Sequence, residues 1–185
     1  SDLFDLRPGE VHAICGENGA GKSTLMRVLG GELRPNAGRT LIEGEDVRLN
    51  GPPDAIKRGI SVIHQEMALA PDLSVAENIF LGNEIATRGV IDRHETNRRT
   101  AELLAKVGLR ESPETKVGSL GMGKQQLIEI AKALSKKVDL LILDEPTSSL
   151  NEHDSAALLR LLASFREEGM TAIMISHKLN ELSQV

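Results

Sequence analysis

The stretch "EVHAICGENGAGKST", residues 10–24, decides the fold of this chain. Its first six residues are largely apolar and predict a buried strand. Residues 16–23 then follow the pattern glycine, any four residues, glycine, lysine, serine, which is typical of a phosphate-binding P-loop. The residues after the loop predict a helix that ends near Gly30 and Gly31. A strand, a glycine-rich loop and a helix in this order predict an α/β fold of the P-loop NTPase (RecA-like) type.

The P-loop residues suit a nucleotide with several phosphates. Glycines let backbone N–H groups converge on phosphate oxygens, and the helix that follows points its positive end at the same place. Within this loop, the charge of Lys22 is expected to neutralise the β- and γ-phosphates. The hydroxyl of Ser23 is expected to ligate Mg²⁺. The alternative is a glycine-rich turn with an incidental lysine.

A second motif, "LLILDEP" at residues 140–146, places two acids after a buried strand. Asp144 lies at the carboxyl end of that strand, where α/β folds bind ligands. We expect Asp144 to hold Mg²⁺ through water, and Glu145 to polarise the water that attacks the phosphate. Two acids before a proline are also a common ending of a strand, so this interpretation depends on its pairing with the P-loop.

Two further polar residues end predicted strands. Gln65 closes "GISVIHQ" and could reach Mg²⁺ and the nucleophilic water, whereas His177 closes "MTAIMISH" and could donate a hydrogen bond to the γ-phosphate. In isolation, a glutamine or histidine at a strand end is more often an ordinary solvated residue. The other histidines show no spacing typical of metal ligands; they are His12, His64, His94 and His153.

The order of elements predicts a parallel sheet with helices on both faces. Apolar strands are expected within residues 10–15, 39–44, 59–65, 138–146 and 170–176, and a long helix within 151–169. Residues 74–134 instead favour helices with highly charged faces. The predicted domains are therefore a nucleotide-binding core at residues 1–66 and 136–185, and an inserted helical subdomain at residues 67–135.

Composition narrows the function classes. The chain has 185 residues and a formal net charge of -5, and its only aromatic residues are three phenylalanines. A net negative charge and a low number of aromatic rings disfavour nucleic-acid binding, because such binding depends on lysine and arginine side chains and on stacking of bases. The single cysteine fits a reducing, cytoplasmic compartment. No apolar run approaches the roughly 20 residues that span a bilayer, so the chain is expected to serve a membrane only by docking to proteins within it.

Taken together, these motifs resemble the nucleotide-binding cassette of ABC transporters. The matching stretches are "GENGAGKST" (Walker A), "VIHQE" (Q-loop), "LGMGKQQ" (signature), "LILDEP" (Walker B), "SSLN" (D-loop) and "SHK" (H-loop). Two longer stretches, "VIHQEMALAPDLSVAENIFLGNE" and "GSLGMGKQQLIEIAKAL", are similar to the first of two tandem cassettes in bacterial monosaccharide importers of the ribose, xylose and galactose type. The stretch "SHKLNE" favours a pentose, with xylose first.

This resemblance implies ATP and Mg²⁺ as ligands and ATP hydrolysis coupled to sugar import. The phosphate ligands that it implies are Gly16, Glu17, Asn18, Gly19, Ala20, Gly21, Lys22, Ser23 and Thr24. It implies Mg²⁺ at Ser23 and Gln65, Glu145 as catalytic base and His177 as γ-phosphate sensor.

The resemblance also implies partners. Residues 149–151 would lie at the seam with a second cassette, and Gly121, Gly123 and Lys124 would face the ATP bound by that cassette. The further partners are membrane permease subunits and, indirectly, a periplasmic sugar-binding protein, at the cytoplasmic face of the bacterial inner membrane. Nucleic acid is not an expected partner. Additional strands, including one with an adenine-stacking aromatic, are expected outside this chain.

One departure and two alternatives remain open. The common signature reads L-S-G-G-Q, whereas residues 120–124 read L-G-M-G-K. The serine hydroxyl of the common signature is therefore absent, and Lys124 adds a positive charge. A glycine-rich helix cap without a ligand is the simpler explanation of this stretch. The alternative functions are an ABC-type ATPase acting on nucleic acid or ribosomes, and a nucleotide-binding module that does not hydrolyse.

Overall fold

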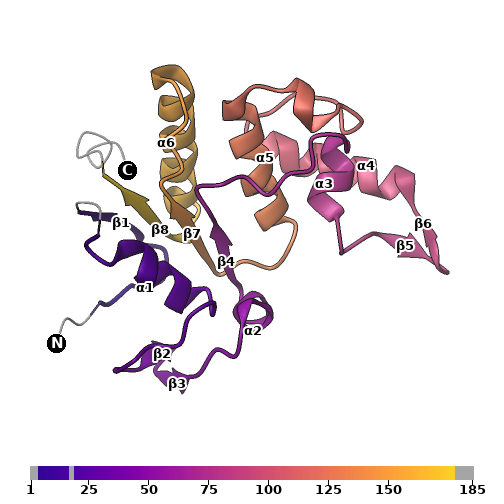
Figure 1. Ribbon diagram of the computed structural model, residues 1–185. Helices are drawn as coiled ribbons and strands as arrows, with labels where there is room; N and C mark the ends of the chain where they lie inside the picture. The colour runs from indigo at the N-terminus through magenta and orange to yellow at the C-terminus, as the bar shows by residue number, and fades with distance from the viewer. Residues whose placement is uncertain (1–3, 17–18, 178–185) are drawn as a thin grey trace. The chain divides into compact units, whose positions relative to one another are not determined.

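The computed structural model describes residues 4–16 and 19–177 (Figure 1). Its helices are α1 (Lys22–Leu29), α2 (Pro52–Lys57), α3 (Val75–Phe80), α4 (Arg93–Lys106), α5 (Met122–Leu134) and α6 (Glu152–Glu167), with a short 3₁₀ turn at Val117–Ser119. Its strands are β1 (Val11–Cys15), β2 (Thr40–Ile42), β3 (Glu45–Val47), β4 (Ile60–Ile63), β5 (Ala86–Thr87), β6 (Val90–Ile91), β7 (Leu140–Asp144) and β8 (Thr171–Ser176). Contacts divide the chain into two compact units. The first comprises Ser1–Gln65, Val138–Ser148 and Leu162–Val185, and the second comprises Glu66–Lys137 and Ser149–Leu161.

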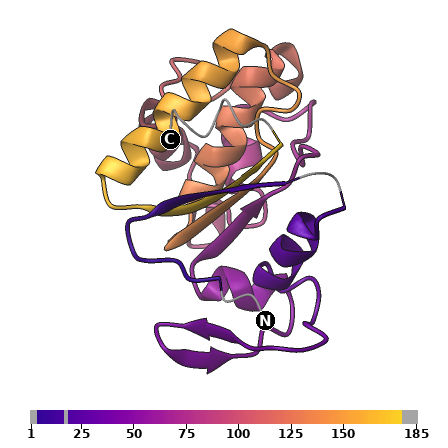
Figure 2. The ribbon, with the colours of Figure 1, turned by 90° about the vertical axis from the view of Figure 1, so that its left-hand side faces the viewer.

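The first unit is built on a parallel sheet with the strand order β1-β8-β7-β4. The two central strands are apolar over Leu141–Leu143 and Ala172–Ile175, where they are buried, as expected for a sheet covered on both faces. Ile142, Ile173 and Ile175 pack with Met26 of α1 and Ala55 of α2 in one core cluster. Figure 2 shows α1 on one face of this sheet and the carboxyl end of α6 on the other. The α/β fold predicted from the sequence is confirmed.

Two elements of the first unit were not among those expected from the sequence. The segment "NGPPD" is rich in helix breakers, yet α2 begins at Pro52 and continues through Pro53. Proline fits the first turn of a helix because its missing N–H has no partner there in any case. The second element is β3, which pairs with β2 in a short antiparallel hairpin outside the main sheet.

The second unit is mainly helical, as its charged periodic segments predict. Ser74 begins α3 with a complete capping box, in which its hydroxyl accepts from the Glu77 amide and the Glu77 carboxylate accepts from the Ser74 amide. Asn78 is fully buried, and its side chain bonds the backbone of Ala70, Leu73 and Ser74. This amide therefore fixes the path of the chain that leads into α3.

A small hairpin of β5 and β6 interrupts the helices of the second unit. Its turn residues, Arg88 and Gly89, both have positive φ, at 53° and 81°. This backbone matches a two-residue turn of type I′, whose twist suits a hairpin. Val90 and Ile91 on β6 are exposed.

Candidate functional site

Four of the predicted site segments lie side by side at the carboxyl edge of the parallel sheet. The P-loop follows β1, His177 follows β8, Glu145 follows β7, and Gln65 lies just beyond β4. Because the strand order is β1-β8-β7-β4, each segment is the neighbour of the next one. The strand register also aligns these carboxyl ends, since Cys15 pairs with Ser176 and Asp144 pairs with Ile175. Open α/β sheets bind their ligands at this edge.

The P-loop backbone requires glycine at two positions. Gly19 and Gly21 have φ of 87° and 84°, a left-handed conformation that side chains disfavour. Gly21 also caps α1, and no side chain bonds the helix at this cap. The first turn of α1 contains no acid, and Ser23 and Thr24 in it are exposed. The positive end of α1 is thus open to an anion.

Lys22 lies within the loop. Its side chain is largely buried at 9% exposure, and its ammonium donates a hydrogen bond to the Gly16 carbonyl. The ammonium is thereby held against the loop backbone, in the residue that begins α1. Ala20 is exposed on the same loop. Glu17 and Asn18, which were also predicted as phosphate ligands, lie outside the described residues.

Asp144 is half-buried at the end of β7. Burial raises the pKa of its carboxyl group, and the negative charge of Glu145 raises it further, while His64 and Lys22 act in the opposite direction. Desolvation and a neighbouring anion both disfavour the carboxylate form. A cation bound beside Asp144 would relieve this cost, so the electrostatics of the residue suit a metal ligand.

Glu145 and His177 meet at the same edge. Nδ1 of His177 lies 3.1 Å from Oε2 of Glu145. Glu145 itself has a φ of 46°, which is uncommon for a residue other than glycine, and its amide donates to the Ile175 carbonyl at 3.0 Å. Non-glycine residues in this conformation concentrate at functional sites. Both contacts come from the end of β8: the Ile175 carbonyl accepts from the Glu145 amide, and the His177 imidazole contacts the Glu145 carboxylate.

Gln65 is tied to the turn that follows Glu145. Its side-chain amide donates to the hydroxyl of Ser148 at 3.4 Å, and the Ser148 amide donates to the Glu145 carbonyl at 3.1 Å. Ser148 was not singled out from the sequence, because a serine in a turn carries no specific signal. It links the predicted amide ligand to the predicted base.

The oxygen groups near this edge fit Mg²⁺ better than a transition metal. Among residues 4–16 and 19–177, no three histidine, cysteine or acidic side chains form a metal cluster. The predicted set instead combines the Ser23 hydroxyl, the Gln65 amide and the Asp144 carboxylate. Mg²⁺ prefers oxygen ligands and is usually held by one or two carboxylates together with substrate phosphates.

The signature residues lie in the second unit, at the start of α5. Gly121 caps α5 without a side-chain hydrogen bond, has ordinary negative φ, and leaves open space where a Cβ would lie. Nothing within the unit therefore requires glycine at this position. Gly123 is different, because a Cβ there would lie 2.4 Å from the Cγ of Asp154. Lys124 pairs with Glu111. The sequence indicated neither acidic neighbour.

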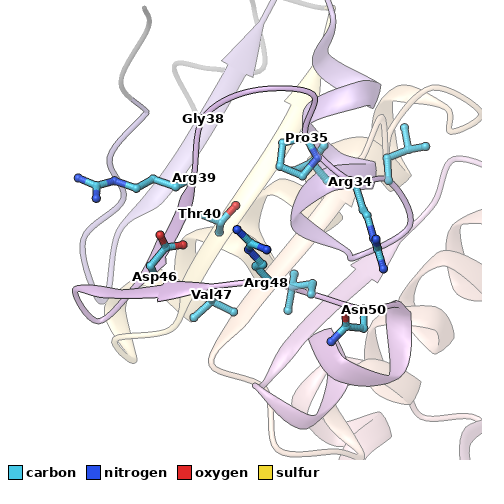
Figure 3. Close-up of a pocket in the computed structure, with 12 residues that line it drawn as sticks. Arg34, Pro35, Gly38, Arg39, Thr40, Asp46, Val47, Arg48 and Asn50 are labelled. Atoms are coloured by element: carbon cyan, nitrogen blue, oxygen red, sulfur yellow. The ribbon is translucent and has the colours of Figure 1, made fainter.

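The first unit also has a pocket that is separate from these residues (Figure 3). It has a volume of about 340 Å³ and lies between the end of α1 and the β2–β3 hairpin. Arg34, Arg48 and Asn50 are among the residues that line it. None of the predicted nucleotide ligands lines this pocket, so it is not part of the candidate site.

Comparison with known proteins reveals related sequences. A family model described as "ABC transporter" matches residues 2–148. The chain is 57% identical to the L-arabinose transport ATP-binding protein AraG of Geobacillus stearothermophilus over 184 residues, which are 98% of this chain and 36% of that protein. It is 49% identical to the xylose import ATP-binding protein XylG of Escherichia coli (strain UTI89) over 183 residues, 97% of this chain and 36% of that protein. The chain thus spans about a third of these relatives.

A solved structure extends the likeness to three dimensions. It is an ATP-binding cassette of an ABC transporter in an ADP conformation, with a TM-score of 0.85 and 25% sequence identity. The match covers 97% of this chain and 75% of that one. The fold is therefore that of an ABC ATPase.

Proposed function

Because this chain belongs to the ABC transporter family, we propose that it is the nucleotide-binding part of an ATPase that powers import of a monosaccharide. We further propose a pentose such as xylose or ribose as the sugar. The names of the two relatives described above specify L-arabinose and xylose, which are both pentoses. Sugar selection itself belongs to the periplasmic binding protein and the permease subunits.

The nucleotide is assigned to the first unit. In this proposal the residues from Gly16 to Thr24 surround the phosphates, with Lys22 supplying charge and the N-terminal amides of α1 supplying hydrogen bonds. Ser23, Gln65 and Asp144 would hold Mg²⁺, which would neutralise charge on the phosphates. The open first turn of α1 and the raised pKa of Asp144 both support this assignment.

Hydrolysis is assigned to Glu145, His177 and Gln65. The Glu145 carboxylate would accept a proton from the attacking water, while His177 and Gln65 would hold the carboxylate, the water and the γ-phosphate in line. Phosphoryl transfer depends mostly on such positioning and on electrostatic stabilisation. The observation that carries the proposal is the meeting of Glu145 and His177 at the sheet edge that bears the P-loop.

The signature segment is assigned to a partner cassette. Gly121 has no structural reason within its own unit to lack a side chain, which supports an approach by something outside that unit. We propose that Gly121, Gly123 and the first turn of α5, including Lys124, face the γ-phosphate of an ATP bound by a second cassette. Residues 149–151 would then lie at the seam between the cassettes.

Membrane attachment is assigned to partners. Among the described residues, none of the helices combines the length and apolar character needed to cross a bilayer. We propose that the protein is peripheral, at the cytoplasmic face of the bacterial inner membrane, where it docks to the permease subunits.

The test is transport by the complete importer. The full-length protein, its permease and its binding protein are reconstituted in liposomes, and uptake of radiolabelled xylose, ribose and L-arabinose is measured with and without MgATP. We expect ATP-dependent uptake of one of these sugars. ATPase activity that responds to DNA or ribosomes but to none of the sugars would contradict the proposal, and so would nucleotide binding without any hydrolysis.

A further inference from the structure

The first turn of α5 has an unfavourable charge. Lys124 is the third residue of this helix, close to its positive end, and the turn contains no acid. A cation at a helix N-terminus opposes the helix dipole, whereas an acid there would be stabilising. The helix also lacks a side-chain cap. Some other group must compensate for these features if the turn is to stay in place.

Glu111 provides that compensation. Its carboxylate forms an ion pair with the ammonium of Lys124, although the two residues are thirteen positions apart. The Glu111 side chain is only 16% exposed, whereas that of Lys124 is 52% exposed. Lys124 lowers the pKa of the Glu111 carboxyl group, and the backbone amides of Glu111 and Arg110 contribute to the same shift. The acid is therefore the fixed member of the pair and the lysine is held against it.

We propose that Glu111 is a positioning residue for the signature: by binding Lys124 it fixes the first turn of α5 and leaves the backbone amides near Gly121 and Gly123 as its phosphate-facing groups. This inference rests on the proposed function. Lys124 then belongs to the phosphate-facing turn through its backbone amide, while its side-chain charge is paired within its own unit. The loop that follows α4 is thereby linked to the signature through one ion pair.

The experiment is a double-mutant cycle in the full-length protein reconstituted with its permease. The variants are Lys124→Gln, Glu111→Gln, the double variant, and the charge-swapped pair Glu111→Lys with Lys124→Glu. The control is Glu102→Gln, which removes a 61%-exposed acid paired with Arg98 on α4 of the same unit. The measurements are kcat and KM for MgATP, binding of a fluorescent ATP analogue, and hydrogen exchange of the amides of residues 125–128, whose hydrogen bonds close the first turn of α5.

We expect each single variant to lower kcat by about threefold to tenfold with little change in binding of the analogue. The double variant should be no worse than the worse single variant, and the swapped pair should recover to within about twofold of the wild type. Hydrogen exchange at residues 125–128 should accelerate in both single variants but not in Glu102→Gln. A general loss of stability would not produce this pattern, because the swapped pair would then fail to recover kcat.

Two results would overturn the inference. The first is a loss of kcat in Lys124→Gln with none in Glu111→Gln, which would place the lysine on the nucleotide. The second is unchanged hydrogen exchange at residues 125–128 in both single variants. If the wild-type importer hydrolyses no ATP, the proposed function fails, and the hydrogen-exchange measurement still decides whether Glu111 fixes this turn.

Discussion

Nδ1 of His177 lies 3.1 Å from Oε2 of Glu145, so that residues from the ends of two adjacent strands share one contact at the carboxyl edge of the sheet. In the tautomer with its proton on Nδ1, the imidazole donates to the carboxylate and its Nε2 is a hydrogen-bond acceptor. The Glu145 backbone is left-handed, and its N–H donates a hydrogen bond to the Ile175 carbonyl. The pair thus presents a carboxylate in a fixed direction without help from a ligand.

Replacement of His177 should impair hydrolysis more than nucleotide binding. We expect His177→Ala to lower kcat for MgATP by about 100-fold, similar in size to the loss of one preorganised donor in other enzymes. The physical reason is that Glu145 loses its imidazole contact while the P-loop is unchanged. The measurement is steady-state ATPase activity of the complete importer, with His94→Ala as control because His94 is exposed on α4. Equal activity of the His177→Ala variant and the wild type would remove His177 from the site.

Lys22→Ala should weaken MgATP binding strongly. The ammonium is largely buried in the P-loop, so no exposed lysine can substitute for its charge. By analogy with the loss of one charge-stabilising donor, the cost is about 3 kcal/mol, which corresponds to roughly a hundredfold weaker binding. Isothermal titration with MgATP checks this, and Lys57→Ala, which removes an exposed lysine of α2, serves as control. Wild-type affinity in Lys22→Ala would be inconsistent with the assigned loop.

Gly123→Ala should disturb α5 through Asp154. An added Cβ would lie 2.4 Å from the Cγ of Asp154 and 2.8 Å from the Cβ of Asp154. Both distances are shorter than two non-bonded carbon atoms can approach. The resulting strain should lower the free energy of unfolding by about 1–3 kcal/mol. Urea unfolding measures this loss, and Asp154→Gly combined with Gly123→Ala should recover part of it. Gly121→Ala is the matched control, because its added methyl meets open space. Additive effects of the Gly123 and Asp154 changes would refute the predicted steric contact.

Asp144→Asn should stabilise the nucleotide-free protein at neutral pH while weakening MgATP binding. The pKa of Asp144 is raised above its ordinary value of 3.8, so the folded state favours the protonated form. The ionised carboxylate of Asp144 therefore lowers the free energy of unfolding at pH values above the pKa of the folded state. This penalty disappears as the pH falls below 3.8, the ordinary pKa of the group. Because the group is partly exposed and screened, the gain should stay below about 1 kcal/mol. Thermal unfolding from pH 4 to pH 8 measures it. A constant difference across this range would argue against the electrostatic cause.

The strands of the main sheet and the larger helices follow from sequence patterns. Residues 140–143 are apolar without alternation, which specifies a strand buried on both faces, and the P-loop pattern fixes the strand and helix around it. Because all four sheet strands are parallel, residues at their carboxyl ends had to share one edge. The neighbourhood of Gln65, Glu145 and His177 was predictable for this reason.

Other features depend on contacts that local patterns do not encode. Pro52 and Pro53 read as breakers, although they begin α2, because the same residues suit both a turn and a first helical turn. The β5–β6 turn places Arg88 at a positive φ, which a sequence argument assigns to asparagine or glycine. The direction of the Lys124 side chain is set by Glu111, and the need for glycine at 123 is set by Asp154; both are tertiary contacts.

The most direct test of the account is single-turnover hydrolysis of MgATP by the full-length Glu145→Gln variant in its reconstituted importer. The exchange keeps the size of the side chain but removes the base, so we expect ATP binding to persist and the rate of hydrolysis to fall by about 10²- to 10⁴-fold. Glu45→Gln, an exposed acid on β3, should hydrolyse at the wild-type rate. Hydrolysis by Glu145→Gln at the rate of the wild type would contradict the assignment of Glu145 as the base and, with it, the mechanism proposed for this sheet edge.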